Sequence, residues 1–279
     1  MRIRLLEILL AGWLLSATLA GWASEPAATE TREASPVTMG ALPEAGGVRF
    51  RVWAPYAKAV KVEGSFPGSP VSLASEGGGK WTALVPGAVH GDSYQYRITG
   101  HFNQNLEKMD PYARHVQHSV GWCYVYDPAA FTWHDAGFTP PERDRMVIYE
   151  MHVGTFSGRN DDSARHPADF RAAIDKVPHL AELGVNMVEV LPVGEFPGDL
   201  SWGYNPSLMF APESSYGGPD AFKAFVDACH QAGIGVILDV VHNHYGPTDL
   251  EMWQFDGWYN TSSSYKGGIY FYNDYRAAT

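Results

Sequence analysis

One carboxylate in this sequence stands where a charge is costly. Asp239 lies near the end of the apolar run GVILDVV, residues 235–241. Moving an ionised carboxylate out of water costs several kcal/mol unless charges or hydrogen-bond donors compensate it. On an extended strand, Asp239 shares a face with Ile237 and Val241. We interpret Asp239 as an acidic group at the base of a pocket, partnered by an arginine or by backbone donors. The alternative is a structural aspartate that a neighbouring loop satisfies.

Two histidines follow this carboxylate directly, in the segment His242-Asn243-His244. Two imidazoles one residue apart at a strand end can bind a metal ion that activates water for hydrolysis. Such a site needs further ligands, and the sequence shows no obvious one. The histidines therefore have three interpretations: a metal pair, polar groups that contact a ligand, or surface side chains without a role.

The elements that position these residues alternate between strand and helix. Apolar runs at 146–153, 185–190 and 235–241 have the length of strands. Between them, apolar residues recur at helical spacing. These residues are Phe170, Ile174, Val177, Leu180 and Leu183 in the first stretch, and Phe222, Phe225, Val226 and Cys229 in the second. Continuous apolar strands in this order predict a parallel sheet that is buried on both faces.

Two prolines and two glycines set the expected helix boundaries. Pro178 breaks the first helical stretch, so we expect a short turn and then a second helix with Asp175 as its cap. Gly184 ends that helix. Pro219 begins the next helix and Gly233 ends it.

Open sheets and closed barrels both produce this alternation of strands and helices. The turn after the first strand, residues 152–158, lacks the glycine pattern G-x-G-x-x-G of dinucleotide-binding sheets. The long connection 191–219 suits a barrel, whose strand-end loops carry function. A complete eight-unit barrel takes about 250 residues, far more than follow Met146. We therefore expect a partial (β/α)8 TIM barrel over 146–279, truncated after its third strand.

The region before the barrel alternates with the shorter period of β-strands. Apolar and polar residues alternate at 48–53, 59–63, 81–85 and 94–98, with turn residues between the runs. This predicts an immunoglobulin-like β-sandwich over 38–128, followed by a connector over 129–145. Trp53 and Trp81 could stack on sugar rings, but their place within alternating runs favours a position in the core.

The first 37 residues have a composition of their own. A charged start, an apolar stretch from Ile8 to Leu15 and small residues up to Ala23 predict a secretory signal over 1–23. The alternative, a membrane anchor, needs a longer apolar run of about 20 residues. Residues 24–37 have almost nothing to bury and predict a disordered linker. We expect a secreted or periplasmic protein that contacts no membrane once the signal is removed.

The overall composition excludes further classes of protein. The chain has 279 residues, with 20 Lys and Arg against 31 Asp and Glu, a formal charge of −11. A chain this acidic does not suit the phosphates of nucleic acid. With 45% hydrophobic residues it can bury a core. Cys123 and Cys229 cannot form a disulfide framework, and we expect two buried free thiols rather than one bridge.

Several segments together resemble a known family. DVVHNH, residues 239–244, is similar to the first signature region of the α-amylase superfamily, the family 13 glycoside hydrolases. The segments VIYEMHVGTF, LAELGVNMVEVLPV and WGYNPSLMFAPESSYGG agree with this family in order and spacing, and resemble branching enzymes and maltooligosyltrehalose trehalohydrolases. GGVRFRVWAPYAKAVKVEGSF resembles a family 48 carbohydrate-binding module, although Pro67–Pro70 replace the Asn and Trp that often follow there. The resemblance covers roughly residues 40–279.

The resemblance implies an enzyme that cleaves or transfers α-1,4-linked glucan through a covalent glycosyl–aspartate intermediate. Carried over to this sequence, His244 would hydrogen-bond the sugar in the subsite being cleaved and Tyr204 would stack beneath that ring. Asp239 would brace the site from within the barrel. No cofactor is implied except the calcium ion of many α-amylases, for which Asn243 matches a ligand. Hydrolases and branching transferases share these residues, and the signal peptide favours glucan breakdown.

The catalytic carboxylates of the family are not among these residues. Retaining glycosidases need two carboxyl groups about 5–5.5 Å apart, and the family takes its nucleophilic aspartate and acid/base glutamate from later strands. We expect both beyond Thr279 and expect the 279-residue chain to be inactive. Glu150, Glu189 and Glu195 are rejected as substitutes, because they match no catalytic position of the family. Two alternatives remain: a non-catalytic carbohydrate-binding protein that uses the sandwich, and a metal-dependent hydrolase built on His242 and His244.

Overall fold

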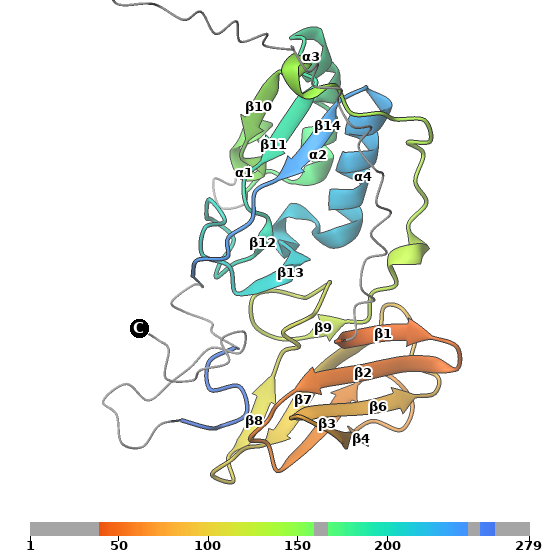
Figure 1. Cartoon of the computed structure of the whole chain (residues 1–279), viewed down its shortest axis with the longest axis vertical. Helices are drawn as coiled ribbons and strands as arrows, with labels where there is room; N and C mark the ends of the chain where they lie inside the picture. Colours follow the sequence, from red (N-terminus) through yellow and green to blue (C-terminus); the bar gives the residue numbers. More distant parts are fainter. Residues whose placement is uncertain (1–38, 159–166, 245–251, 260–279) are drawn as a thin grey trace, which may run out of the picture. The chain divides into compact units, whose positions relative to one another are not determined.

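The computed structural model describes residues 39–158, 167–244 and 252–259. The predicted signal and linker, residues 1–37, lie outside them. Within the described ranges, no helix has the length and apolar character needed to cross a membrane. Antiparallel sheets form first along the chain, and a parallel sheet with helices follows (Figure 1).

The first part is built from two antiparallel sheets. One has the order β1-β2-β6-β5, and the other has the order β4-β3-β7-β8 with β9 paired to β7. The strands are β1 (Gly40–Glu44), β2 (Gly47–Trp53), β3 (Ala59–Gly64), β4 (Val71–Ser72), β5 (Ala74–Gly77), β6 (Lys80–Val85), β7 (Ser93–Thr99), β8 (Asn105–Lys108) and β9 (Cys123–Tyr124). The four runs predicted from alternation are β2, β3, β6 and β7.

The core of these sheets follows the predicted alternation. Phe50 on β2 is fully buried, and its ring lies 5.0 Å from that of Tyr94 on β7. Trp53 and Trp81 pack against this core, and the indole Nε1 of Trp81 donates to the carbonyl of Ala54 at 3.0 Å. These two tryptophans are partly buried and pack against the core, so their interpretation as core residues is confirmed only in part. Cys123 and Cys229 are both buried free thiols, as predicted.

A connector with two short 3-10 helices, η1 (Pro128–Ala130) and η2 (Arg143–Arg145), leads to the parallel sheet. It contacts α4 (Gly218–Gln231) through two reciprocal pairs. His134 Nδ1 lies 3.0 Å from Asp227 Oδ2, and Asp135 Oδ2 lies 2.7 Å from His230 Nδ1. Neighbouring residues of the connector thus pair with residues one turn apart on α4.

The second part contains the predicted βαβ units. Strands β10 (Ile148–Met151), β11 (Met187–Val190) and β14 (Gly235–Leu238) form a parallel sheet in that order. The helices are α1 (Val153–Phe156), α2 (Phe170–Ile174), α3 (Val177–Glu182) and α4. The connection after β11 contains an antiparallel pair, β12 (Gly194–Glu195) and β13 (Leu208–Pro212), and the turn η3 (Ser214–Tyr216). Each parallel strand is shorter than predicted, because the ends of the apolar runs belong to loops.

The helices cover one face of the parallel sheet. Val188 and Val190 of β11 are fully buried in the same cluster as Phe170 of α2 and Phe225 of α4, whose rings lie 5.7 Å apart. Leu183 is 58% exposed and does not belong to this face, so its assignment to the apolar stripe is wrong. It is the last residue before the left-handed Gly184, where the chain already leaves the helix.

The predicted cap at Asp175 is also wrong. Asp175 has helical angles (φ −61°, ψ −17°) and ends α2, whereas a residue that caps a helix start is extended. Asp169 caps α2 instead, because its carboxylate accepts the N–H of Ala172 at 2.9 Å. The N-cap of α3 is Lys176, with Pro178 in the first turn as predicted.

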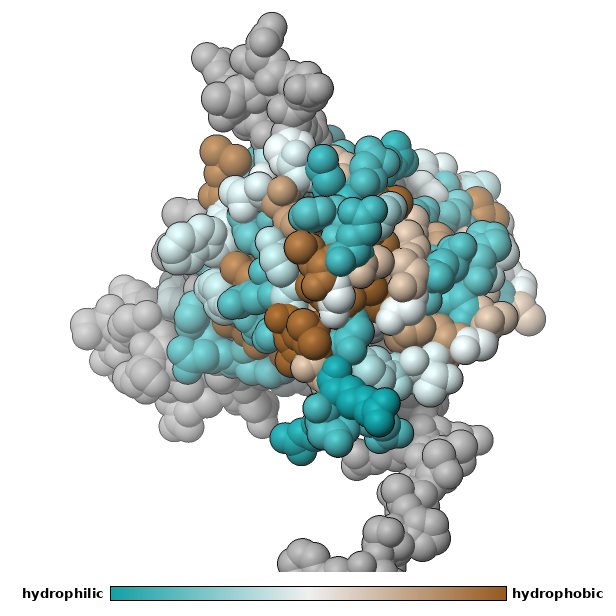
Figure 2. Space-filling model, turned by 90° about the horizontal axis from the view of Figure 1, so that it is seen from above, coloured by the Kyte–Doolittle hydropathy of each residue, from teal (hydrophilic) through white to brown (hydrophobic). Residues whose placement is uncertain are grey.

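The opposite face of the parallel sheet is open at β10. Ile148 is 50% exposed, and Glu150 on the same face also lies at the surface. The prediction of burial on both faces is therefore wrong for this strand, because the buried residues that contact the helices lie on the other face. On the face of the molecule seen from above, hydrophobic residues lie at the surface among hydrophilic ones (Figure 2).

Candidate functional site

The structure brings Tyr204, Asp239 and His244 together. The Tyr204 hydroxyl donates to Asp239 Oδ2 at 2.6 Å, and His244 Nε2 lies 2.5 Å from the backbone carbonyl oxygen of Tyr204. Tyr204 is thus held both at its hydroxyl and at its backbone, while 40% of its surface stays exposed. Three positions from two separate segments meet in one place, and their role in substrate binding stays a prediction.

The parallel sheet fixes the position of Asp239. Its N–H donates to the carbonyl of Val190 at 3.0 Å, which continues the β11–β14 pairing just past the end of β14. Asp239 therefore lies at the carboxyl end of its strand, where active sites of barrels open. The predicted partner, an arginine or a backbone donor, is replaced by the Tyr204 hydroxyl, because the loop between β12 and β13 brings this side chain to the strand end.

Acidic groups surround the Tyr204 hydroxyl. The hydrogen bond to Asp239 raises the pKa of Tyr204 to about 12, with smaller contributions from burial and from the carboxylates of Asp239, Glu150 and Glu189. Glu150 and Glu189 are register partners on β10 and β11. The phenol consequently stays protonated and remains a donor at neutral pH. The negative charges of these carboxylates favour neutral ligands with hydroxyl groups over anions.

A strained turn carries Tyr204 to the site. Gly203 has φ +86°, and a Cβ at this position would lie 1.8 Å from the carbonyl oxygen of Pro192. The Gly203 N–H donates to Ser201 Oγ at 3.1 Å. The Ser201 carbonyl lies 2.8 Å from His152 Nε2 and accepts from the Tyr216 hydroxyl at 3.4 Å. Only glycine fits this approach of backbone to backbone.

In the segment His242-Asn243-His244, Asn243 and His244 help to position the backbone of Tyr204. Asn243 Nδ2 donates to His244 Nδ1 at 3.0 Å, so that the proton of the neutral ring lies on Nε2 and points at the Tyr204 carbonyl. Of the described residues, no three His, Cys, Asp or Glu side chains are grouped so that they could hold a metal ion. A role of Asn243 in calcium binding stays a prediction.

A hollow of about 250 Å³ opens beside Asp239. Its walls are mostly apolar and include Gly203, Pro206, Met209, Phe210, Leu238 and His242. Apolar walls with one fixed carboxylate and a nearby phenol suit a ring that has both a hydrocarbon face and hydroxyl groups.

A pair of buried glutamates, which the sequence did not single out as a pair, supports the loop. Glu195 is 1% exposed and accepts the N–H of Ser214 at 2.7 Å, while Glu213 is fully buried and accepts the N–H of Phe196 at 3.1 Å. Each carboxyl group thus binds the residue that follows the other glutamate. Burial and the nearby Glu213 raise the pKa of Glu195 to about 8, and burial raises the pKa of Glu213. Glu195 thus holds the loop through its hydrogen bonds to Ser214, and its rejection as a catalyst stays a prediction.

This pair makes the stability of the protein depend on pH. Glu195 keeps its proton to a higher pH in the folded protein than in the unfolded chain. The free energy of unfolding therefore falls as pH rises from about 4.5 towards 8, by up to about 1.4 kcal/mol per pH unit for one proton. Glu195→Gln removes this titration, and its amide can donate to Ser214 Oγ, which now donates to Oε1 at 3.2 Å. We expect Glu195→Gln to stabilise the protein by about 1–3 kcal/mol at pH 8 and to have little effect at pH 4.5.

Urea unfolding of both proteins at the two pH values measures this difference. Glu182→Gln is the matched control, because its carboxylate is exposed on α3 and solvent reaches it in both states. An equal effect of Glu195→Gln at pH 4.5 and pH 8 would contradict the prediction.

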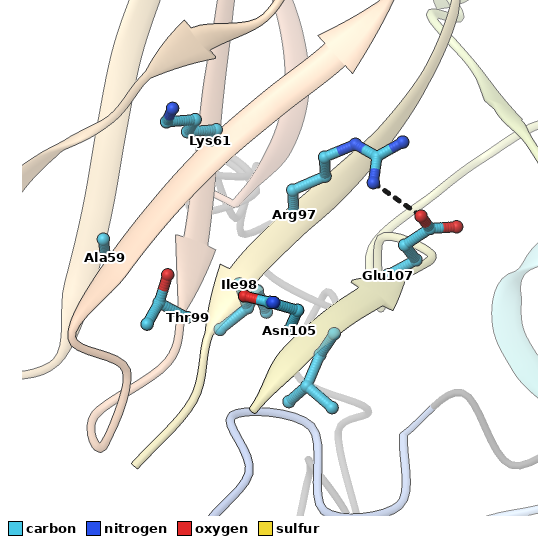
Figure 3. Close-up of a pocket in the computed structure, with 8 residues that line it drawn as sticks. Ala59, Lys61, Arg97, Ile98, Thr99, Asn105 and Glu107 are labelled. Atoms are coloured by element: carbon cyan, nitrogen blue, oxygen red, sulfur yellow. Dashed lines mark hydrogen bonds and ion pairs between the residues drawn. The ribbon is translucent and has the colours of Figure 1, made fainter. Parts of the chain in front are cut away.

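A second hollow of about 320 Å³ lies on the β3-β7-β8 sheet (Figure 3). None of its eight lining residues is aromatic, and the set includes Lys61, Arg97, Thr99, Asn105 and Glu107. The Arg97 guanidinium is engaged by Glu63 and by Glu107, the latter at 2.5 Å. The hollow therefore lacks the aromatic platform that a sugar face prefers, and it does not favour the alternative of a carbohydrate-binding protein that uses the sandwich.

Comparisons with known proteins agree with both parts of the fold. Residues 38–113 match carbohydrate-binding module 48 (isoamylase N-terminal domain), and residues 147–275 match the alpha amylase catalytic domain. The predicted resemblance is thus confirmed. The exact domain boundaries stay predictions.

Two curated relatives are similar to this chain in sequence. A 1,4-alpha-glucan branching enzyme of Pseudoalteromonas atlantica is 37% identical, over 75% of this chain and 30% of its own length. A malto-oligosyltrehalose trehalohydrolase of Saccharolobus solfataricus is 35% identical, over 76% of this chain and 35% of its own. The chain spans about a third of the length of these relatives.

Two solved structures have a similar fold. A putative alpha amylase from Salmonella typhimurium has a TM-score of 0.70 and 36% identity, over 83% of this chain and 38% of its own. A pullulanase from Anoxybacillus complexed with maltotetraose has a TM-score of 0.64 and 28% identity, over 75% of this chain and 35% of its own. The described fold thus has structural counterparts in both of these proteins.

Proposed function

We propose that this protein is an α-glucan-active glycoside hydrolase or transglycosylase of the retaining type. Its substrates would be starch, glycogen or maltodextrins with α-1,4 linkages. The observation that carries the proposal is the arrangement of Tyr204, Asp239 and His244 at the carboxyl ends of parallel strands. An aromatic ring fixed at the hydroxyl and at the backbone is a rigid platform for one sugar ring.

Within this proposal, each of the three residues has one task. Tyr204 supports the apolar face of the sugar ring bound for cleavage, and Asp239 holds the phenol in place. His244 orients the backbone of the platform, because its Nε2–H points at the Tyr204 carbonyl and its Nδ1 accepts from Asn243. The hydrogen bond to a sugar hydroxyl that the resemblance implies would have to replace one of these two contacts. We add no metal to this arrangement, because His244 Nε2 faces the Tyr204 carbonyl rather than an open site.

Export is part of the same proposal. The charged and apolar residues 1–23 support a secretory signal. A secreted or periplasmic location favours breakdown of external glucan over branching of internal stores. Hydrolysis is therefore the activity that we propose for the whole enzyme.

Calorimetry on the 279-residue chain tests the substrate class without requiring turnover. We expect maltotriose to bind, and cellotriose to bind at least about tenfold more weakly, since its β-linkages turn each ring relative to the next. Tyr56→Ala is a control for loss of an exposed tyrosine, because Tyr56 is 39% exposed on the sandwich. It should retain the affinity. Absence of maltotriose binding by the wild type would overturn the proposal.

A further inference from the structure

Strand β13, in the second part of the chain, packs against the core of the sandwich. Leu208 is fully buried and Ala211 is 1% exposed, and both belong to the same apolar cluster as Phe50 and Met109 of the sandwich. Phe210 lies on the same strand and is 48% exposed. The sandwich therefore contacts the end of the connection that carries Tyr204.

Phe210 stacks on an aromatic ring of the sandwich. The centroid of its ring lies 5.2 Å from that of Tyr112, with 9° between the two planes. Phe210 also lines the hollow of about 250 Å³ beside Asp239, whereas Tyr112 is not among the residues that line it. An exposed side chain with no such contact changes rotamer within picoseconds to nanoseconds. The stack with Tyr112 thus holds one wall of the hollow in place.

Tyr112 itself is fixed by the interior of the sandwich. Its N–H donates to Asp110 Oδ1 at 2.9 Å. Asp110 is fully buried, and its Oδ2 accepts the Tyr94 hydroxyl at 2.7 Å. A Cβ at Gly40 would lie 3.1 Å from the Cβ of Tyr112, so the backbone of β1 also packs closely against this residue. Since close-packed interiors leave side chains little freedom, Tyr112 is a rigid support for the ring that it contacts.

These contacts form one continuous path from the sandwich core to the hollow. Resting on the proposed function, we infer that Tyr112 is a positioning residue for α-glucan binding: its ring holds Phe210 in the orientation in which Phe210 forms a wall of the sugar site. The sandwich then contributes to affinity through the shape of the site, without Tyr112 touching the sugar. A wall that is ordered before the ligand arrives lowers the entropic cost of binding.

Fluorine NMR on the full 279-residue chain tests the positioning step without any sugar. With 4-fluorophenylalanine in place of the 13 phenylalanines, the Phe210 signal is identified by its loss in Phe210→Leu. We expect this signal to narrow about twofold in Tyr112→Leu, because the ring gains freedom, and to keep its width in Tyr112→Phe, which retains the stack. Phe225 is fully buried among the helices and should keep its width in every variant, which shows that the fold is intact.

Calorimetry with maltotriose tests the consequence for the sugar site. We expect Tyr112→Leu to weaken binding about fivefold to tenfold and Tyr112→Phe to stay within about twofold of the wild type. Tyr56→Leu is the matched control, because Tyr56 is a stacked tyrosine of the sandwich whose partner, Trp258, is not among the residues that line the hollow. Its affinity should equal that of the wild type.

The outcomes separate this inference from the proposed function. An unchanged width of the Phe210 signal in Tyr112→Leu overturns the inference, with or without sugar binding. Equal affinity of Tyr112→Leu and the wild type for maltotriose overturns it too, because the wall would then not matter to the ligand. If the wild type binds no maltotriose while the Phe210 signal narrows as expected, the proposed function is wrong and the positioning of Phe210 by Tyr112 stands.

Discussion

Replacing Gly203 by alanine is expected to weaken maltotriose binding about 100-fold. The new Cβ would lie 1.8 Å from the carbonyl oxygen and 2.7 Å from the carbonyl carbon of Pro192. Both are backbone atoms, so the loop itself has to shift. A displacement of about 1 Å at a positioned group costs about two orders of magnitude, and Tyr204 is the next residue. We also expect the free energy of unfolding to fall by about 1–3 kcal/mol, since φ is +86°.

Gly198→Ala separates the steric clash from the backbone strain. Gly198 lies in the same loop with φ +74°, and a Cβ there meets nothing within 4 Å. This variant should lose some stability and keep its affinity for maltotriose. Calorimetry and urea unfolding of both variants give the comparison. Equal affinities of Gly203→Ala and the wild type would show that the turn does not position Tyr204.

Periodicity was enough to predict four strands of the sandwich, the three parallel strands and the helical stretches between them. The alternation at Val48, Phe50 and Val52 reports a half-buried strand, and these three residues are indeed inside the sandwich. The parallel order of β10, β11 and β14 follows from apolar runs separated by helices. Local rules were weaker at element ends. Asp175 was predicted to cap α3, but its helical backbone angles place it at the end of α2, and the sequence does not state such angles.

The candidate site was predictable in its location and only partly in its contacts. Asp239 is identifiable because a charge inside an apolar strand needs a partner. Parallel strands bring their carboxyl ends to one edge, which also places His244. Tyr204 could be associated with them only by resemblance. Its hydrogen bond to Asp239 depends on how the whole β12–β13 connection closes, and such closure leaves no local pattern in the sequence.

The contacts of the glutamate pair were not predictable from local sequence patterns either. Glu195 and Glu213 are 18 positions apart, and each accepts from the backbone next to the other. Glu213 also accepts the N–H of Ser215 at the start of η3. This is a cap signal, but a weak one, because glutamate is not among the preferred N-cap residues. Glutamate is usually found at the surface. Sequence rules therefore predict exposed side chains for Glu195 and Glu213, not two buried carboxyl groups close together.

Tyr204→Ala is expected to weaken maltotriose binding about 100-fold. The change removes the ring face that supports the sugar, and aromatic groups at the centre of a site contribute about 2 kcal/mol or more. Tyr204→Phe keeps the ring but leaves the Asp239 carboxylate without the donor that now lies at 2.6 Å. We expect this second variant to lose about fivefold to tenfold, because a hydrogen bond to a charged group is worth about 1–3 kcal/mol and Tyr204 is partly exposed to water.

A spectroscopic measurement distinguishes positioning by Asp239 from a general loss of structure. In Asp239→Asn the charge that disfavours the phenolate is gone, so the pKa of Tyr204 should fall from about 12 towards the ordinary value of tyrosine. The chain has 15 tyrosines, so the signal of Tyr204 has to be isolated. The tyrosinate absorbance is measured for each protein with and without Tyr204→Phe, and the difference follows the titration of Tyr204. If Asp239→Asn leaves that titration where it is, Asp239 does not hold the phenol. If Tyr204→Ala still binds maltotriose like the wild type, the phenol is not the platform, and the glucan site lies elsewhere in the molecule.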